Sequence, residues 1–268
     1  MLIKPFIAYL TEAELHQIMT SGFATIAGSV LAAYISLGIS AVSLVSSCVM
    51  SIPSSLSISK LRYPETEDSL TAGKITVPED TDEKPANSLH AFANGSWLGI
   101  KIGGMIIAVL LCIVALLGLC NGILGWWGRY LNIPSLSIQF ILGYLFWPVA
   151  FFLGVERKNG DVLKVAQLIG TKIIANEFVA FVALTSDPTY ASLSSRSRLI
   201  ATYALCGFGN IGSIGIQIGV LSQLAPGQSG RIAKVALSAL FSGVISTLTS
   251  ASIAGMLITD QAKYTQVA

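Results

Sequence analysis

The sequence predicts an all-α, polytopic integral membrane protein, and three observations carry that prediction. The 268 residues are 53% hydrophobic and only 11% charged, with a mean hydropathy of +0.71, whereas soluble domains average about 25% charged residues. Residues 102–120 and 235–259 are uncharged runs long enough to cross a bilayer as helices. Residues 21–52 and 139–155 are further apolar stretches without a charge.

The charge distribution excludes some other classes of function. The formal net charge is only +2, and the basic residues occur in short pairs that are typical of the flanks of membrane segments. We therefore expect a lipid bilayer as the surroundings, a multi-pass protein in the plasma membrane, and no nucleic acid partner. No Ser/His/Asp arrangement or metal-ligand set is evident, and His16 and His90 lie outside the apolar segments. The sequence therefore does not predict an enzyme.

The first apolar stretch is followed by a polar segment. Residues 63–88 hold three prolines and half of the fourteen acidic residues, namely Glu65, Glu67, Asp68, Glu79, Asp80, Asp82 and Glu83. Charge and proline at this density prevent a segment from burying much surface. We expect a solvated loop that takes no part in a site.

Glu177 is the most informative residue of the second half, because it lies in the apolar run 173–184. A carboxylate at membrane depth costs several kcal/mol unless it is paired, so it marks a substrate or ion path. The alternative is a soluble helix with one exposed glutamate, but only Asn176 shares that polar face. Gly170 and Thr171 before the run and Asp187 after it favour a re-entrant hairpin.

Residues 207–212 match the pattern G-x-G-x-x-G. A dinucleotide site would need a strand before the motif and an acidic residue about 20 positions after it, yet the flanks are apolar and the next acid is Asp260. The glycines instead favour a membrane helix that opens, with Asn210 and Ser213 supplying polar groups. Close helix packing through Gly215-x-x-x-Gly219 is the alternative for that pair.

Two segments of the chain resemble each other, which supports an internal repeat. Residues 22–29 resemble residues 207–213 when one gap is allowed, and a serine-rich apolar stretch follows each copy. Interrupted helices in corresponding positions indicate a transporter built from repeats, with its site at their interface. The same repeat predicts a hairpin ahead of the first copy, for which the residues before position 11 leave no room.

Three stretches, 22–30, 165–180 and 195–215, resemble in sequence and in order the concentrative nucleoside transporters, which are cation-coupled nucleoside symporters. The resemblance runs from residue 2 to about residue 258. It corresponds to the C-terminal portion of that family and lacks its first re-entrant hairpin.

The resemblance implies an inverted-repeat transporter fold assembled as a homotrimer, with nucleosides as substrates, Na⁺ or H⁺ as the coupling ion and no other cofactor. It divides the chain into four regions. Residues 1–62 hold the first interrupted helix and a serine-rich helix, and residues 63–96 form an acidic loop and an amphipathic segment that leads to the next helices. Residues 97–160 form scaffold-type membrane helices. Residues 161–268 hold the second hairpin, the second interrupted helix and the second serine-rich helix.

The resemblance also assigns site residues by motif. Glu177 is expected to bind ribose hydroxyls, with the remaining substrate contacts from Asn210, Ser213, Phe208, Val30 and Ser29. Thr25 and Ile26 are expected to bind Na⁺. Two functions remain open: the chain supplies the C-terminal half of a symporter's site, or it is a truncated, transport-incompetent membrane subunit of the same family.

Overall fold

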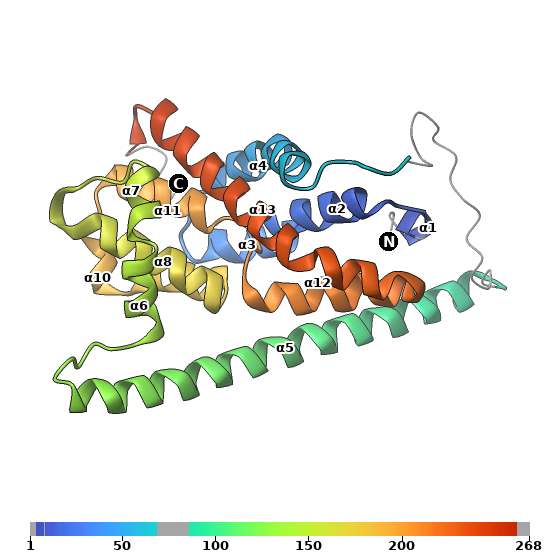
Figure 1. Ribbon diagram of the computed structural model, residues 1–268, viewed down its shortest axis with the longest axis horizontal. Helices are drawn as coiled ribbons and strands as arrows, with labels where there is room; N and C mark the ends of the chain where they lie inside the picture. The colour runs from blue at the N-terminus through green and yellow to red at the C-terminus, as the bar shows by residue number, and fades with distance from the viewer. Residues whose placement is uncertain (1–3, 8, 69–85, 262–268) are drawn as a thin grey trace.

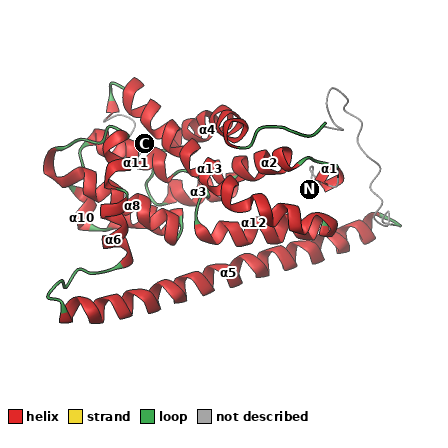
Figure 2. Ribbon diagram, viewed as in Figure 1, coloured by secondary structure: helices red, strands yellow, loops and turns green. Residues whose placement is uncertain are grey.

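The computed structural model describes residues 4–7, 9–68 and 86–261, and within these ranges every regular element is a helix (Figures 1 and 2). The α-helices are α1 (Lys4–Ile7), α2 (Glu12–Ala24), α3 (Gly28–Ser36), α4 (Ala41–Arg62), α5 (Ser88–Tyr130), α6 (Ile138–Leu145), α7 (Trp147–Phe152), α8 (Asp161–Ile174), α9 (Glu177–Ser186), α10 (Pro188–Ala191), α11 (Ser195–Leu205), α12 (Ile211–Leu224) and α13 (Ser229–Leu257). Short 3₁₀ turns, η1 (Lys158–Gly160) and η2 (Pro226–Gln228), precede α8 and α13. The predicted all-α class is confirmed.

Among the described residues, three helical segments are long and apolar enough to cross a membrane: Ala41–Arg62, Ser88–Tyr130 and Pro226–Leu257. The apolar stretch 139–155 does not form a single span, because it divides at Phe146 into α6 and α7. Pro148 lies in the first turn of α7, where its missing N–H costs nothing, whereas inside one long helix it would remove a hydrogen bond.

The predicted acidic loop falls mostly on residues 69–85, which lie outside the described residues. After it, α5 begins at Ser88, where the Asn87 side chain accepts a hydrogen bond of 2.8 Å from the His90 backbone N–H. A side-chain oxygen at this position satisfies one of the free N–H groups of the first turn.

The two glycine-rich segments are interrupted helices, as predicted. The first interruption, residues 25–27, separates α2 from α3, and the second, residues 206–210, separates α11 from α12. The two interruptions meet, because the Phe208 backbone N–H donates to the Thr25 carbonyl oxygen at 3.3 Å. Backbone groups freed by each interruption are therefore partly satisfied by the other.

Gly207 is required at this crossing. Its φ of +153° is a conformation that other residues rarely adopt, and a Cβ there would lie 3.0 Å from the Ala24 carbonyl oxygen and 2.7 Å from Thr247 Cγ2. The glycines of the motif thus allow two chains to approach closely, as well as weakening the helix.

The segment around Glu177 is a pair of short helices, α8 and α9, that pack against each other and are joined at Ala175 and Asn176. The Asn176 side chain accepts a hydrogen bond of 2.8 Å from the Val179 N–H and so caps α9. Helices of 14 and 10 residues are each shorter than the roughly 20 residues that a full span needs. They form the predicted hairpin.

A polar seam runs through the other half of the molecule, where α13 crosses α2 and α4 (Figure 1). Serines recur every fourth residue along one face of α4, and all are fully buried: Ser43, Ser47, Ser51, Ser55 and Ser59. Ser51 and Ser250 hydroxyls lie 3.2 Å apart, and Ser246 donates to the Ser51 carbonyl oxygen at 3.2 Å. Small hydroxyl side chains let helices approach closely in a membrane and bond across the contact.

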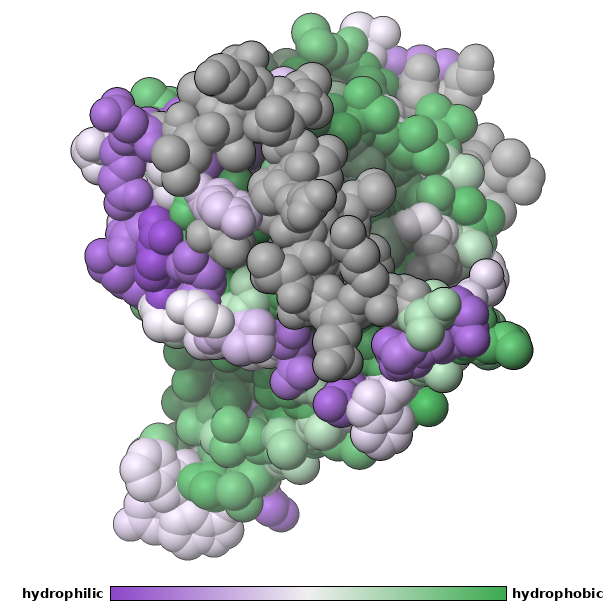
Figure 3. All heavy atoms as spheres, turned by 90° about the vertical axis from the view of Figure 1, so that its right-hand side faces the viewer, coloured by the Kyte–Doolittle hydropathy of each residue, from purple (hydrophilic) through white to green (hydrophobic). Residues whose placement is uncertain are grey.

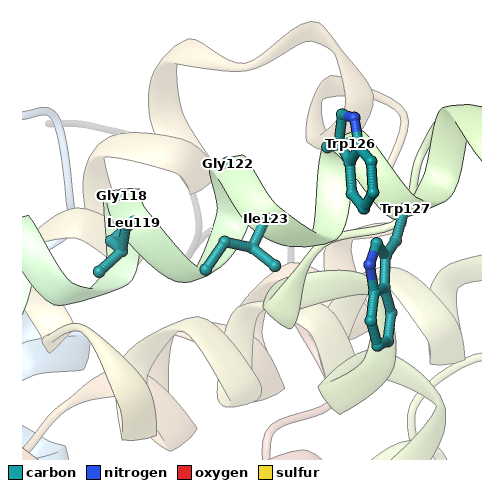
Figure 4. Close-up of a pocket in the computed structure, with 6 residues that line it drawn as sticks. All are labelled: Gly118, Leu119, Gly122, Ile123, Trp126 and Trp127. Atoms are coloured by element: carbon teal, nitrogen blue, oxygen red, sulfur yellow. The ribbon is translucent and has the colours of Figure 1, made fainter.

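Helix α5 lies along the outer side of α12 (Figure 1), and Met105 packs against Gly219. Close helix packing is therefore the explanation of that glycine. The C-terminal half of α5 carries an open apolar hollow lined by Gly118, Leu119, Gly122, Ile123, Trp126 and Trp127 (Figure 4). All six lining residues are uncharged, so this hollow resembles a lipid-facing surface more than a polar binding site.

Charged side chains gather where α2 and α13 begin. Lys234 lies 2.9 Å and Arg231 4.0 Å from Glu12, and Arg231 lies 3.5 Å from Glu67. Figure 3 looks onto this end and shows hydrophilic residues beside a broad hydrophobic surface. A polar end and apolar flanks are typical of a multi-pass membrane protein.

We expect the substitution Gly207→Ala to destabilise the protein by about 1–3 kcal/mol, because alanine is strained at this φ and its methyl group would press on the Ala24 carbonyl. Thermal unfolding of the detergent-purified protein measures this. Gly209→Ala is the matched control, since the nearest atom to its added Cβ is a movable methyl group of Val244, at 3.0 Å. Equal unfolding temperatures for the two variants would contradict this account of the crossing.

Candidate functional site

The candidate site is built around Glu177, the first residue of α9, whose side chain is 6% exposed. The Tyr34 hydroxyl donates to Oε1 at 3.2 Å, and the Asn210 amide donates to Oε2 at 2.9 Å. A carboxylate is also favoured in the first turn of a helix, where the dipole is positive. One charged group thus joins α3, the hairpin helix α9 and the start of α12.

Asn210 is fixed at both ends of its amide. While Nδ2 bonds to Glu177, Oδ1 accepts a hydrogen bond of 2.8 Å from the Ser213 backbone N–H and caps α12. Ser213 is buried in the first turn of α12. The structure therefore brings Glu177, Asn210 and Ser213 together, and the connection to Ser213 passes through its backbone.

Three other predicted substrate residues come from the two interrupted helices. Phe208 lies in the second interruption, partly exposed, with its carbonyl bonded to the Asn210 N–H at 2.9 Å. Val30 is partly buried on α3, one turn before Tyr34 and on the same face. Ser29 is part of α3, but its side chain lies outside the described residues.

The two predicted cation ligands lie in the first interruption. The Thr25 hydroxyl donates to the Ser21 carbonyl at 2.8 Å, which leaves the lone pairs of its oxygen free, and its carbonyl accepts from the Phe208 N–H. Ile26 follows in the same unwound stretch. Carbonyl and hydroxyl oxygens at the partly negative C-terminal end of a helix suit Na⁺, so the residues present fit that ion.

Within the described ranges, no group of three or more His, Cys, Asp or Glu side chains could hold a metal ion. The two cation ligands predicted from the sequence, Thr25 and Ile26, offer neutral oxygens instead. That chemistry is compatible with a weakly bound, exchangeable monovalent ion.

Lys172 is a buried charge that the sequence analysis missed. It lies on α8, is 1% exposed, and donates to the Ala204 carbonyl oxygen at 2.8 Å and to the Thr247 hydroxyl at 3.3 Å. Its ammonium group interacts favourably with the Glu177 carboxylate. Lys172 immediately precedes the apolar run 173–184 that contains Glu177. The cost of placing a charge at membrane depth applies to it as well, so this signal could have identified it.

Tyr34 was also missed, and nothing local distinguishes it. It is a fully buried tyrosine within the apolar stretch 21–52, with its ring 4.7 Å from that of Phe181. Its role is set by a partner 143 residues away, which no periodic pattern reveals.

The arrangement can bind a polar ligand. A carboxylate has about four acceptor positions, and the structure gives Glu177 one donor on each oxygen from a neighbouring side chain. The backbone N–H of Glu177 is a further donor, so hydroxyl groups of a ligand would take the position that remains or replace a present donor, in bonds about twice as strong as neutral ones. Phe208 and Val30 supply apolar surface near these polar groups.

Comparison with known proteins gives a consistent picture. The family described as "Na+ dependent nucleoside transporter C-terminus" matches residues 43–255. Solute carrier family 28 member 3 of Mus musculus is 42% identical over 271 aligned residues, which cover 96% of this chain and 38% of that protein. Sodium/nucleoside cotransporter 1 of Oryctolagus cuniculus is 39% identical over 272, covering 96% and 41%.

Solved structures agree. CNTnw in an inward-facing substrate-bound state is 36% identical, with a TM-score of 0.78 over 95% of this chain and 59% of that one. A CNTnw variant in an intermediate state is 38% identical, with a TM-score of 0.81 over 96% and 61%. The chain spans about two fifths of the length of the curated relatives it matches.

The hydrogen bond from Tyr34 can be tested by stability. We expect Tyr34→Phe to destabilise the protein by about 1–3 kcal/mol, because a buried carboxylate oxygen loses its donor, and to lower the unfolding temperature in detergent. Tyr144→Phe makes the same chemical change at a position 57% exposed and should have little effect. If both variants unfold at the wild-type temperature, the bond to Glu177 does not contribute to stability.

Proposed function

This chain belongs to the Na⁺-dependent nucleoside transporter family, and on that premise we propose that it supplies the C-terminal part of the site of a nucleoside:cation symporter. The observation that carries the proposal is the buried Glu177 carboxylate, held by Tyr34 and Asn210 where the hairpin meets both interrupted helices. An ionisable residue in this position within a membrane marks a substrate path by default.

In the proposed site the ribose of a nucleoside bonds to Glu177. Its vicinal hydroxyls donate to the carboxylate, and Asn210 and Ser213 complete the sugar contacts. Phe208 and Val30 line the nucleobase, beside Ser29. Because these residues come from the hairpin and from both interrupted helices, a bound nucleoside would draw the three elements together, which is how binding energy can favour a closed state.

The proposed coupling ion is Na⁺, held by the Thr25 hydroxyl and carbonyl and the Ile26 carbonyl. When bound, it supplies positive charge at the partly negative end of α2 and links uptake to the ion gradient. Thr25 also bonds directly to the Phe208 N–H. Cation and nucleobase contacts are thus one hydrogen bond apart, and this favours coupling of the two ligands.

The remaining parts of the proposal concern the assembly. We place the protein in the plasma membrane as a homotrimer, with a transport part made of residues 1–62 and 161–268 and a scaffold made of residues 97–160. Support comes from the family to which the chain belongs and from the apolar surface of α5, whose membrane window is not buried by the described part of the chain.

We expect Glu177→Gln to reduce uptake of radiolabelled uridine and adenosine about 10- to 100-fold, because charge-assisted hydrogen bonds to the ribose are lost. The measurement is Na⁺-driven uptake into proteoliposomes, with trimer assembly checked by cross-linking. Asp187→Asn is the matched control: Asp187 is exposed, caps α10 through the Thr189 N–H at 2.8 Å, and asparagine caps equally well. Unchanged uptake by Glu177→Gln would remove Glu177 from the site.

The same assay distinguishes the two functions left open by the sequence. The chain is expressed alone and, separately, extended at its N-terminus by the N-terminal part of a full-length relative. Uptake by the extended protein only, abolished by Glu177→Gln, means that these residues supply part of a larger site. Absence of uptake in both, with a normally assembled protein, favours a transport-incompetent subunit.

The ribose contact makes a second, more specific prediction. Wild-type protein should prefer uridine to its 2′,3′-dideoxy analogue, because the analogue lacks the two hydroxyl groups that would donate to Glu177. Glu177→Gln should lose most of that preference. Competition between the two nucleosides for labelled uridine measures it, and an equal preference in both proteins would place the ribose elsewhere.

A further inference from the structure

The ammonium group of Lys172 lies at the end of a broken helix. Helix α11 stops at Leu205, and the last four carbonyls of a helix have no partner within it and carry partial negative charge. The Ala204 carbonyl, one of these four, accepts a hydrogen bond of 2.8 Å from Lys172 Nζ. The Thr247 hydroxyl on α13 is the second oxygen, at 3.3 Å.

These oxygens are of the same kinds as those of the first interruption. There the Thr25 hydroxyl and carbonyl stand at the end of α2, and here the Ala204 carbonyl and the Thr247 hydroxyl stand at the end of α11. Unwound carbonyls and half-helix C-termini are the usual cation ligands of transporters built from repeats. The two interruptions therefore offer similar surroundings to a positive charge, and a lysine fills the second.

Resting on the proposed function, we propose that Lys172 is a tethered cation that occupies the second interruption, in the place that a second Na⁺ would take, so that the coupling ion binds at the first interruption alone. A lysine ammonium suits this role because it is a compact point charge with three donors. Full burial of such a charge is costly without partners. Two oxygens accept hydrogen bonds from it, and the Glu177 carboxylate attracts it at longer range.

Removal of the charge should create a cation site. In Lys172→Met the Ala204 carbonyl and the Thr247 hydroxyl lose their positive partner, and the nearby Glu177 loses its compensating charge. Na⁺ added to the solution could then bind to the same oxygens. Lys172→Arg retains the charge and should not create the site.

The test is thermal unfolding of the detergent-purified full chain, without nucleoside, across a series from choline chloride to NaCl at constant ionic strength. Lys172→Met should unfold several degrees below wild type in choline chloride and regain most of the difference in NaCl, because a ligand that binds only the folded state raises its stability. The Na⁺-induced shift should be clearly larger than in wild type. Lys164→Met is the control, since Lys164 is on the same helix, partly exposed, and bonded to Ser192.

Two results would overturn the proposal. One is a loss of stability in Lys172→Met that NaCl restores no more than in wild type, which would make Lys172 a structural cap only. The other is an unfolding temperature of Lys172→Met in choline chloride that equals that of the wild type. If methionine prevents folding, Lys172→Gln takes its place, because the glutamine amide can still donate to Ala204 without carrying a charge, and the same two results would overturn the proposal.

The outcome is separable from that of the nucleoside site, because the probe is Na⁺ alone. A larger Na⁺ shift in Lys172→Met together with unchanged uptake in Glu177→Gln would keep the tethered cation and reject the ribose site. Where uptake is measurable, Lys172→Met should also show a steeper Na⁺ dependence, with a Hill coefficient higher by about one. A Hill coefficient equal to that of wild type would contradict the proposal.

Discussion

A helix that stops inside a membrane leaves backbone N–H and C=O groups that must find partners within the protein, since lipid offers none. This constraint governs the centre of the molecule. Asn176 and Asn210 cap the N-terminal ends of α9 and α12, and Phe208 donates to Thr25 where the two interruptions cross. Groups that satisfy these backbone atoms also make up the candidate site, so the fold and the candidate site depend on the same few atoms.

Charge is balanced within the same region. The hairpin carries both Glu177 and Lys172, five residues apart, and each reaches a different partner in the second interrupted helix: Asn210 at the start of α12 and Ala204 at the end of α11. Both ends of the second interruption are thus held by one hairpin. A ligand that competes for the Glu177 oxygens would therefore act on the whole interruption.

Sequence alone predicted the helical class, both interrupted helices, the hairpin and the acidic residue at its tip, because glycine-rich motifs and a charge in an apolar run are local signals. Contacts between distant segments could not be predicted in this way. Tyr34 looks like an ordinary core aromatic, and His16, placed outside the apolar segments, is fully buried between Ser59 and Ser238. The division of residues 139–155 depends on Pro148, which is itself a local signal for a helix boundary.

The serine face of α4 has a consequence for movement. Ser47 donates to the Tyr203 carbonyl of α11, Ser51 meets Ser250 of α13, and Ser55 and Ser59 meet Ser21 and His16 of α2. Because the serines recur every four residues, a shift of α4 by four residues toward its C-terminal end, about 6 Å with a rotation of about 40°, would return a serine hydroxyl to each of these partners. Such a surface sets the distance between the helices. It restricts displacement along the helix axis less strongly, because equivalent hydroxyl pairs are available in more than one register.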